Sequence, residues 1–190
     1  MADINIIPTL INSVQTISIL AGLVSGIVAY KRWSKSLSLK RADYVNELFN
    51  RIRTNELISD AIYIIDYDID WYSPSFHESG LRKDEDNSYP IEKKIDYTFA
   101  YFSYICYLYE NKIIGDEDFI FFEYHVNRIF NSEQAIDYLY NIYHFSKAFN
   151  SKCSFHYLIK YGNDHKLIGS DFEDKEAYKT TDKYHKYLPF

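Results

Sequence analysis

The chain has 190 residues, enough for one membrane-spanning helix and a single globular domain. Its formal net charge of −6 is unevenly distributed, because residues 1–41 contain five basic residues and one acidic residue, which leaves −10 for the remainder. An acidic domain is a poor candidate for non-specific nucleic-acid binding, so we expect no direct DNA binding. The two cysteines have neither disulfide nor zinc spacing, and we expect no metal or other cofactor.

The first predicted element is the stretch from Ile4 to Tyr30, which contains no charged residue. About 20 apolar residues of helix cross a hydrocarbon core, so this length favours a transmembrane helix over an interfacial or buried core helix. Polar residues in its first half make the span marginal. A cleaved signal peptide places its positive charges before the apolar run, whereas only Asp3 precedes this one. Because the basic residues follow the run, we expect an outer N-terminus and a cytoplasmic C-terminal domain.

Small and polar side chains share one face of this helix, within an arc of about 140° at 100° per residue. Gly22 and Gly26 form a GxxxG pattern, which allows helices to approach closely, and amide side chains avoid lipid. We therefore expect the face to mediate homo-oligomer formation and to line an aqueous path. It consists of Asn12, Gln15, Ser18, Gly22, Ser25, Gly26 and Ala29.

The residues that follow the uncharged stretch are expected at the membrane interface. Aromatic rings prefer the headgroup layer, and the basic side chains there are interpreted as a stop-transfer flank that stays on the cytoplasmic side, with binding of anionic headgroups as the alternative. Residues 1–36 are therefore assigned to a transmembrane helix and its basic flank. The interface residues are Tyr30, Lys31, Arg32, Trp33 and Lys35.

Helical periodicity continues from Lys40 to about Tyr67, and no glycine or proline lies between Val28 and Trp71, which predicts a helix with little interruption. Asp66 is interpreted as part of a solvated helix terminus. The Pro, Gly and charged residues of 71–92 are typical of a surface loop.

Three further helices are predicted between Ile91 and Phe149. The first covers 91–112, the second begins at a capping Asp116, and the third opens with Asn131 and Gln134. The residues expected to face inward from the last two are Phe119, Phe122, Val126, Ile129, Phe130, Ile136, Leu139, Tyr140, Tyr143 and Phe149.

A final short helix is expected around 152–161, ending at Gly162. The pattern as a whole predicts an all-α fold, with a cytosolic helical bundle at 37–165 and a polar C-terminal tail at 166–190.

One local motif bears on chemistry, the segment Asn150–His156. It resembles the HEPN nuclease signature, in which an Arg precedes a His by four to six intervening residues and the pair assists attack by a ribose hydroxyl across a dimer without metal. No Arg occupies that place here, and Lys152 lacks the bidentate fork of a guanidinium. The segment is therefore at best a degenerate HEPN-like motif, a packed or hydrogen-bonded core histidine at position 156 is the preferred interpretation, and no catalytic residue is assigned.

An N-terminal span, a basic flank and an acidic helical domain with this motif together resemble the small membrane accessory proteins of type VI-B CRISPR systems. The resemblance implies a pore-forming oligomer at the bacterial inner membrane, with an antiphage role coupled to an RNA-guided effector. Three functions remain open: a non-enzymatic membrane effector, a membrane-tethered metal-independent RNase, and a scaffold that recruits a partner protein.

Overall fold

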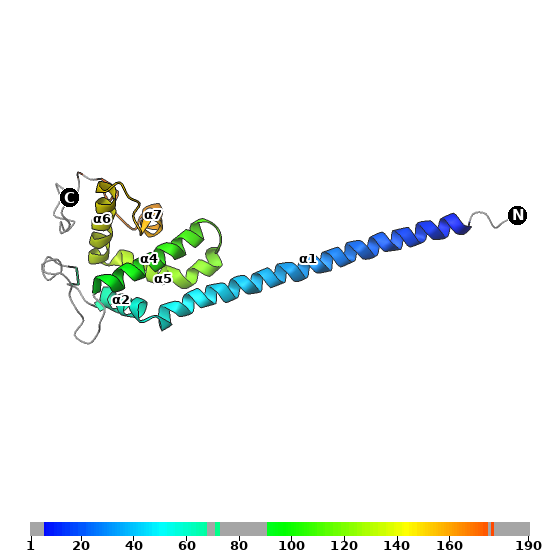
Figure 1. Cartoon of the computed structure of the whole chain (residues 1–190), viewed down its shortest axis with the longest axis horizontal. Helices are drawn as coiled ribbons and strands as arrows, with labels where there is room; N and C mark the ends of the chain where they lie inside the picture. Colours follow the sequence, from blue (N-terminus) through cyan, green and yellow to red (C-terminus); the bar gives the residue numbers. More distant parts are fainter. Residues whose placement is uncertain (1–5, 68–70, 73–90, 175, 177–190) are drawn as a thin grey trace. The chain divides into compact units, whose positions relative to one another are not determined.

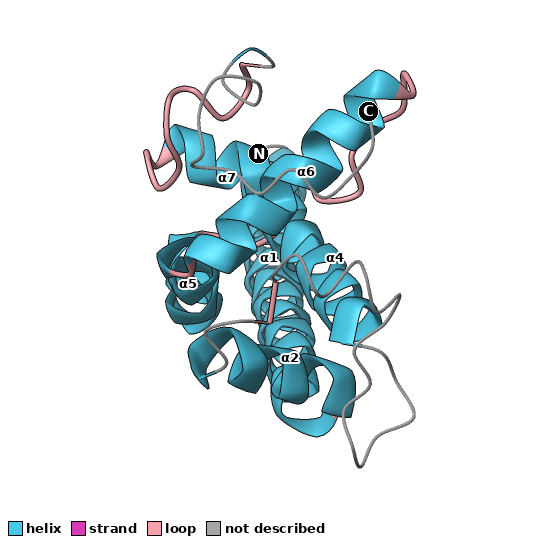
Figure 2. Ribbon diagram, turned by 90° about the vertical axis from the view of Figure 1, so that its left-hand side faces the viewer, coloured by secondary structure: helices cyan, strands magenta, loops and turns pink. Residues whose placement is uncertain are grey.

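The computed structural model describes residues 6–67, 71–72, 91–174 and 176, with side chains described from Gln15 onward. These residues form helices and loops and no strand (Figure 2), so the predicted all-α class is confirmed. The predicted surface loop at 71–92 lies mostly outside the described residues, but Trp71 and Tyr72 are buried, so a surface position was wrong for its first two residues. The chain divides into two compact units, Met1–Tyr44 and Val45–Phe190, and the boundary falls within helix α1 (Ile6–Thr54; Figure 1).

The first unit contains the N-terminal part of α1, including the expected membrane span. Among the residues whose side chains are described, no helix is long and apolar enough to cross a membrane, so the span is not supported. The uncharged part of the helix carries the polar side chains of Gln15, Thr16 and Ser18.

The second unit begins with the last turns of α1, where Val45, Leu48 and Ile52 are buried. The helix expected to run to Tyr67 is interrupted at Asn55, and α2 (Glu56–Tyr67) starts immediately after it. The Asn55 Oδ1 accepts hydrogen bonds from the backbone N–H groups of Leu57 and Ile58, at 3.0 and 3.4 Å. Asn55 therefore caps α2, and the helix that was predicted to run with little interruption is divided in two at this residue.

Helix α4 (Ile91–Glu110) is the central element of this unit, because eleven of its 20 residues are buried. It packs against α2, and against α5 and α7 further along the chain. The Tyr101 hydroxyl donates a 2.5 Å hydrogen bond to the Leu48 carbonyl, which ties α4 to the end of α1. The expected helix at 91–112 is confirmed.

Helices α5 (Asp116–Asn131) and α6 (Glu133–Ala148) meet at Ser132. Ser132 caps α6 through its hydroxyl, and the N-cap of α5 is Gly115, whose N–H donates to Asp118 at 3.0 Å. The predicted caps, Asp116 and Asn131, were therefore each wrong by one residue.

The five inward residues predicted for α5 are buried, as are Leu139, Tyr140 and Tyr143 of α6. Ile136 is half-buried. Phe149 is 66% exposed, so its predicted inward position was wrong. It lies beyond the last residue of α6, where the helical period no longer places side chains.

Helix α7 (His156–Asp164) starts and ends later than predicted and continues through Gly162. A Cβ built on Gly162 would lie 2.6 Å from Cε1 of Phe130, so this glycine permits close packing of α7 on α5 instead of ending the helix. The left-handed residue that follows α7 is Lys166, with a φ of 56°. The Leu167 N–H then donates to the Gly162 carbonyl at 2.8 Å, which closes the helix end.

Part of the expected tail also packs on the bundle. Phe172 is fully buried, and its carbonyl lies 2.9 Å from Nε2 of the buried His144. The Tyr140 hydroxyl donates to the Asp174 carbonyl at 3.2 Å. Residues 167–174 therefore complete the core beside α6.

Candidate functional site

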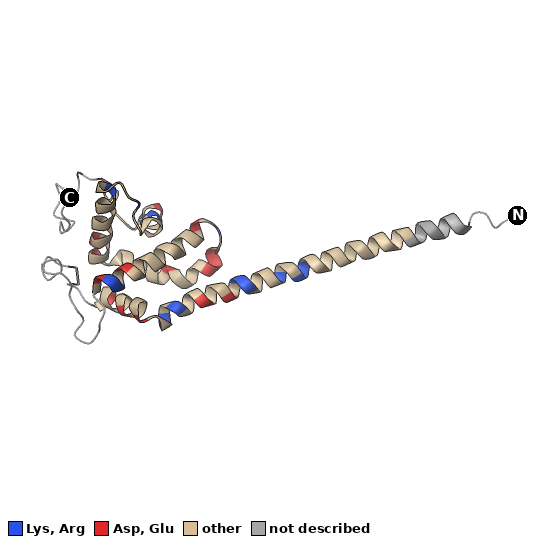
Figure 3. Cartoon of the chain, viewed as in Figure 1, with Lys and Arg blue, Asp and Glu red and all other residues tan. Residues whose placement is uncertain are grey.

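The part of α1 from Gln15 to Tyr30 exposes an uncharged surface. In Figure 3 it follows the grey turns as a tan segment and ends at the first blue residue. Its large apolar side chains are 42–66% exposed, and none is buried by the rest of its unit. Contiguous exposed apolar surface of this kind marks a place where a protein meets another protein or a membrane. The apolar residues are Ile17, Ile19, Leu20, Leu23, Val24, Ile27 and Val28.

The predicted small-residue face lies within this surface. A Cβ built on Gly22 or Gly26 meets no atom within 4 Å, so both glycines open onto free space. They lie in a shallow, open groove of about 620 Å³ along the helix, which Ile19, Leu23 and Ile27 also line. The predicted small-residue face did not include these three larger side chains.

The remaining predicted members of the small face lie in the same helix. Gln15, Ser18, Ser25 and Ala29 are exposed and do not line the groove. Asn12 also lies in α1, but outside the residues whose side chains are described.

The predicted interface residues follow directly along α1, and all five are exposed. The rings of Tyr30 and Trp33 contact each other, with centroids 6.2 Å apart. Lys31 also lines the end of the groove. The uncharged surface therefore ends in a ring of aromatic and basic side chains.

In the HEPN-like segment, Asn150 has a structural role. Its φ of 53° lies in the left-handed region, which asparagine tolerates better than most residues. The Ser151 N–H donates to the Ser146 carbonyl at 2.9 Å, a bond that closes the end of α6. Asn150 does not line the neighbouring cavity, so the structure does not bring it together with His156.

Lys152 and His156 do share a cavity of about 780 Å³ beside α7, together with Ser151, Cys153 and Ser154. Both side chains are exposed, so the preferred interpretation of His156 as a core histidine was wrong. Burial raises the pKa of the Cys153 thiol, which disfavours the nucleophilic thiolate. The cavity offers hydroxyl, ammonium and imidazole groups to a polar ligand.

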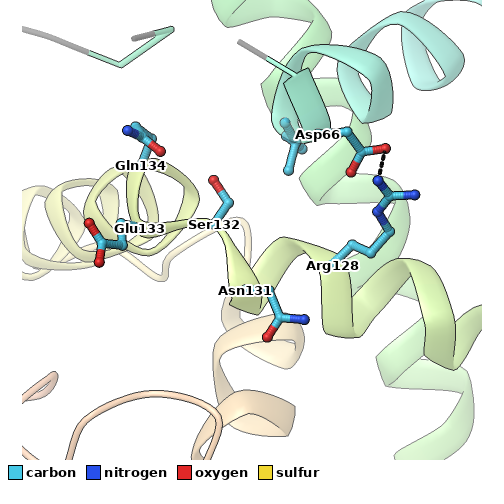
Figure 4. Close-up of a pocket in the computed structure, with 7 residues that line it drawn as sticks. Asp66, Arg128, Asn131, Ser132, Glu133 and Gln134 are labelled. Carbon is cyan, nitrogen blue, oxygen red and sulfur yellow. Dashed lines mark ion pairs between the residues drawn. The ribbon is translucent and has the colours of Figure 1, made fainter. Parts of the chain in front are cut away.

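A second polar cleft of about 470 Å³ lies where the end of α2 meets the α5–α6 junction (Figure 4). An Nη2 atom of Arg128 lies 2.5 Å from Oδ2 of Asp66, and the Asp66 side chain is only 7% exposed. The prediction of a solvated Asp66 was therefore wrong. No local signal revealed this pair, because its members are far apart in the sequence and on different helices.

The guanidinium of Arg128 is committed to neighbouring side chains. Besides Asp66, it donates to the Tyr124 hydroxyl at 2.7 Å and lies 5.2 Å from the centre of that ring. Burial and the nearby Arg128 lower the pKa of His125. The cluster therefore ties α2 to α5 through the Asp66–Arg128 ion pair.

Among the described residues, no group of three or more His, Cys, Asp or Glu side chains could hold a metal ion. No known protein family, curated protein or solved structure matches the chain.

Proposed function

We propose that the chain is a membrane-associated, self-associating accessory effector whose oligomers form a pore and compromise the inner membrane in antiphage defence. In this proposal the N-terminus faces outward, the second unit is cytoplasmic, and activity is coupled to an RNA-guided effector, as the family resemblance implies. The observation that carries the proposal is the exposed, uncharged surface of α1 between Gln15 and Tyr30.

The free energy available from burying the exposed apolar side chains of α1 supports their contact with a partner helix or with lipid. Burying one exposed Leu, Ile or Val side chain contributes about 1.5–3 kcal/mol. Seven such side chains, already partly covered by their own helix, would contribute on the order of 10 kcal/mol when fully buried. Association of helices costs a comparable amount, about 4–15 kcal/mol, so membrane insertion and self-association would act together.

The shape of the groove supports self-association. Gly22 and Gly26 provide the space that a neighbouring helix needs, and Ile19, Leu23 and Ile27 provide ridges that would fit the same groove of another copy. The polar groups of Gln15 and Ser18 are costly in lipid, so in an oligomer they would face another helix or water. Several helices arranged in this way would enclose a polar path.

The experiment replaces Gly22 and Gly26 with leucine in the full-length protein and compares the variant with Ala21→Leu. Ala21 is exposed on the same helix but does not line the groove, so a leucine at this position adds bulk outside the groove. The glycine variant should lose oligomers on a native gel and should no longer depolarise cells that express it, whereas Ala21→Leu should do neither. Unchanged assembly and depolarisation in the glycine variant would contradict the proposal.

A second candidate function is a membrane-tethered RNase, which is favoured by the shared cavity of Lys152 and His156. It predicts RNA cleavage in the presence of a metal chelator, and loss of that cleavage in His156→Ala but not in His165→Ala. Purified protein that leaves single-stranded RNA intact would exclude it. If the protein assembles at the membrane without depolarisation or cleavage, the remaining function is a scaffold for a partner protein.

A further inference from the structure

Basic side chains are concentrated directly beside the uncharged surface of α1. Lys31, Arg32 and Lys35 are exposed, and Lys40 and Arg41 follow them in the same helix (Figure 3). No acidic residue lies between residues 4 and 42. The carboxylates nearest to this cluster along the chain are therefore those of Asp3 and Asp43.

Helical geometry brings three of these charges together. At 100° per residue, Lys31, Arg32 and Lys35 fall within an arc of about 100°, and the Tyr30 and Trp33 rings occupy the other side at the same level. A rise of 1.5 Å per residue places Lys31 and Lys35 about 6 Å apart along the axis. The headgroup layer of one leaflet is roughly 5–8 Å thick, so the basic group matches its depth.

We propose that Lys31, Arg32 and Lys35 bind the phosphate groups of anionic lipids, and that the protein therefore prefers membranes rich in such lipids. This inference rests on the proposed membrane association of α1. Lipid is favoured over nucleic acid as the ligand because the basic residues adjoin exposed aromatic rings and an uncharged part of the helix. The remaining part of the chain is acidic and would repel a polyanion that extended beyond this segment.

Lys40 and Arg41 provide a matched comparison within the same helix. Arg41 lies about 9 Å beyond Lys35 along the axis, which is close to the Debye length of about 10 Å at 0.1 M salt. Their attraction to the headgroups should therefore be weaker and more strongly screened.

The experiment measures flotation of the full-length protein with phosphatidylcholine vesicles, with and without phosphatidylglycerol. Each basic residue at the headgroup level should contribute about a 5-fold preference for the anionic vesicles. Lys31→Gln with Lys35→Gln should therefore lower that preference by about 25-fold. Lys40→Gln with Arg41→Gln removes the same charge and should lower it much less, and high salt should remove the difference between the variants.

Equal flotation with both kinds of vesicle would overturn the lipid preference and leave the proposed membrane association intact. Flotation with neither would overturn both proposals. Equal losses from the two double variants would contradict the assignment to headgroup depth. Displacement of the protein from anionic vesicles by single-stranded RNA at equal phosphate concentration would contradict the choice of lipid over nucleic acid.

Discussion

Substitution of Gly162 by alanine tests how α7 packs on α5. The added Cβ would lie 2.6 and 2.7 Å from Cε1 and Cζ of Phe130, where ordinary contacts begin at 3.4 Å. Phe130 is only 5% exposed, so its ring has little room to move away. Overpacking of this kind typically costs about 1–3 kcal/mol, and the helix propensity of alanine over glycine offsets about 1 kcal/mol. The net loss in the free energy of unfolding is therefore about 0–2 kcal/mol.

Because these two effects oppose each other, the decisive quantity is the coupling with Phe130→Leu. Leucine lacks the two ring atoms that clash, so in that background Gly162→Ala should stabilise the protein by up to about 1 kcal/mol. The coupling free energy should then be about 1–3 kcal/mol, well above the additivity error of distant sites. Urea unfolding of the natural protein, the two single variants and the double variant, followed by circular dichroism, measures this coupling free energy. Additive effects of the two substitutions, or a stabilising Gly162→Ala in the natural background, would refute the packing argument.

Three further outcomes follow from other residues of the second unit. Lys166→Gly should raise the unfolding free energy by about 0.5–1 kcal/mol, because glycine adopts a positive φ without strain. Asn150→Gly should change the unfolding free energy less, because asparagine already tolerates a positive φ. Equal effects of the two substitutions in thermal melts would contradict this explanation. His125 has a lowered pKa because of burial and Arg128, so its contribution to stability is present above pH 6.5 and is lost as the pH falls through the lowered value. Urea titrations should show a shallower acid decline in His125→Gln, and an unchanged decline would argue against a lowered pKa of the half-buried His125. Asp66→Asn should destabilise the unit by about 1.5–3 kcal/mol, since it removes a charged partner of Arg128, and an unchanged urea midpoint would show that the ion pair contributes nothing.

The positions of the helices and of their buried residues were predictable from the sequence wherever apolar residues recur on one face of the helix. Helix α5 is the clearest example, because Phe119, Phe122 and Val126 follow the helical period and all are buried. The interruption at Asn55 was missed because glycine and proline were taken as the signals of a break. Asparagine ends one helix and caps the next through its own side chain, which the sequence does not distinguish from a solvated position.

The candidate sites were predictable only where they depend on neighbouring positions of one helix. The glycines of the α1 groove and the basic residues beside it were found from spacing along a single element. The Asp66–Arg128 pair and the role of Gly162 depend on contacts between helices that are distant in the sequence. Such contacts follow from tertiary packing, which a single sequence without homologues does not reveal.

The late position of Phe172 in the chain has a consequence for the order of events during synthesis. Phe172 follows Tyr30 by 142 residues, and the core of the second unit is closed only when Phe172 has been made. At about 5–20 residues per second, the ribosome needs roughly 7–28 s to cover that distance. The apolar segment of α1 thus leaves the ribosome well before the bundle can fold. Recognition of that segment by the targeting machinery or by a chaperone would therefore precede folding of the bundle.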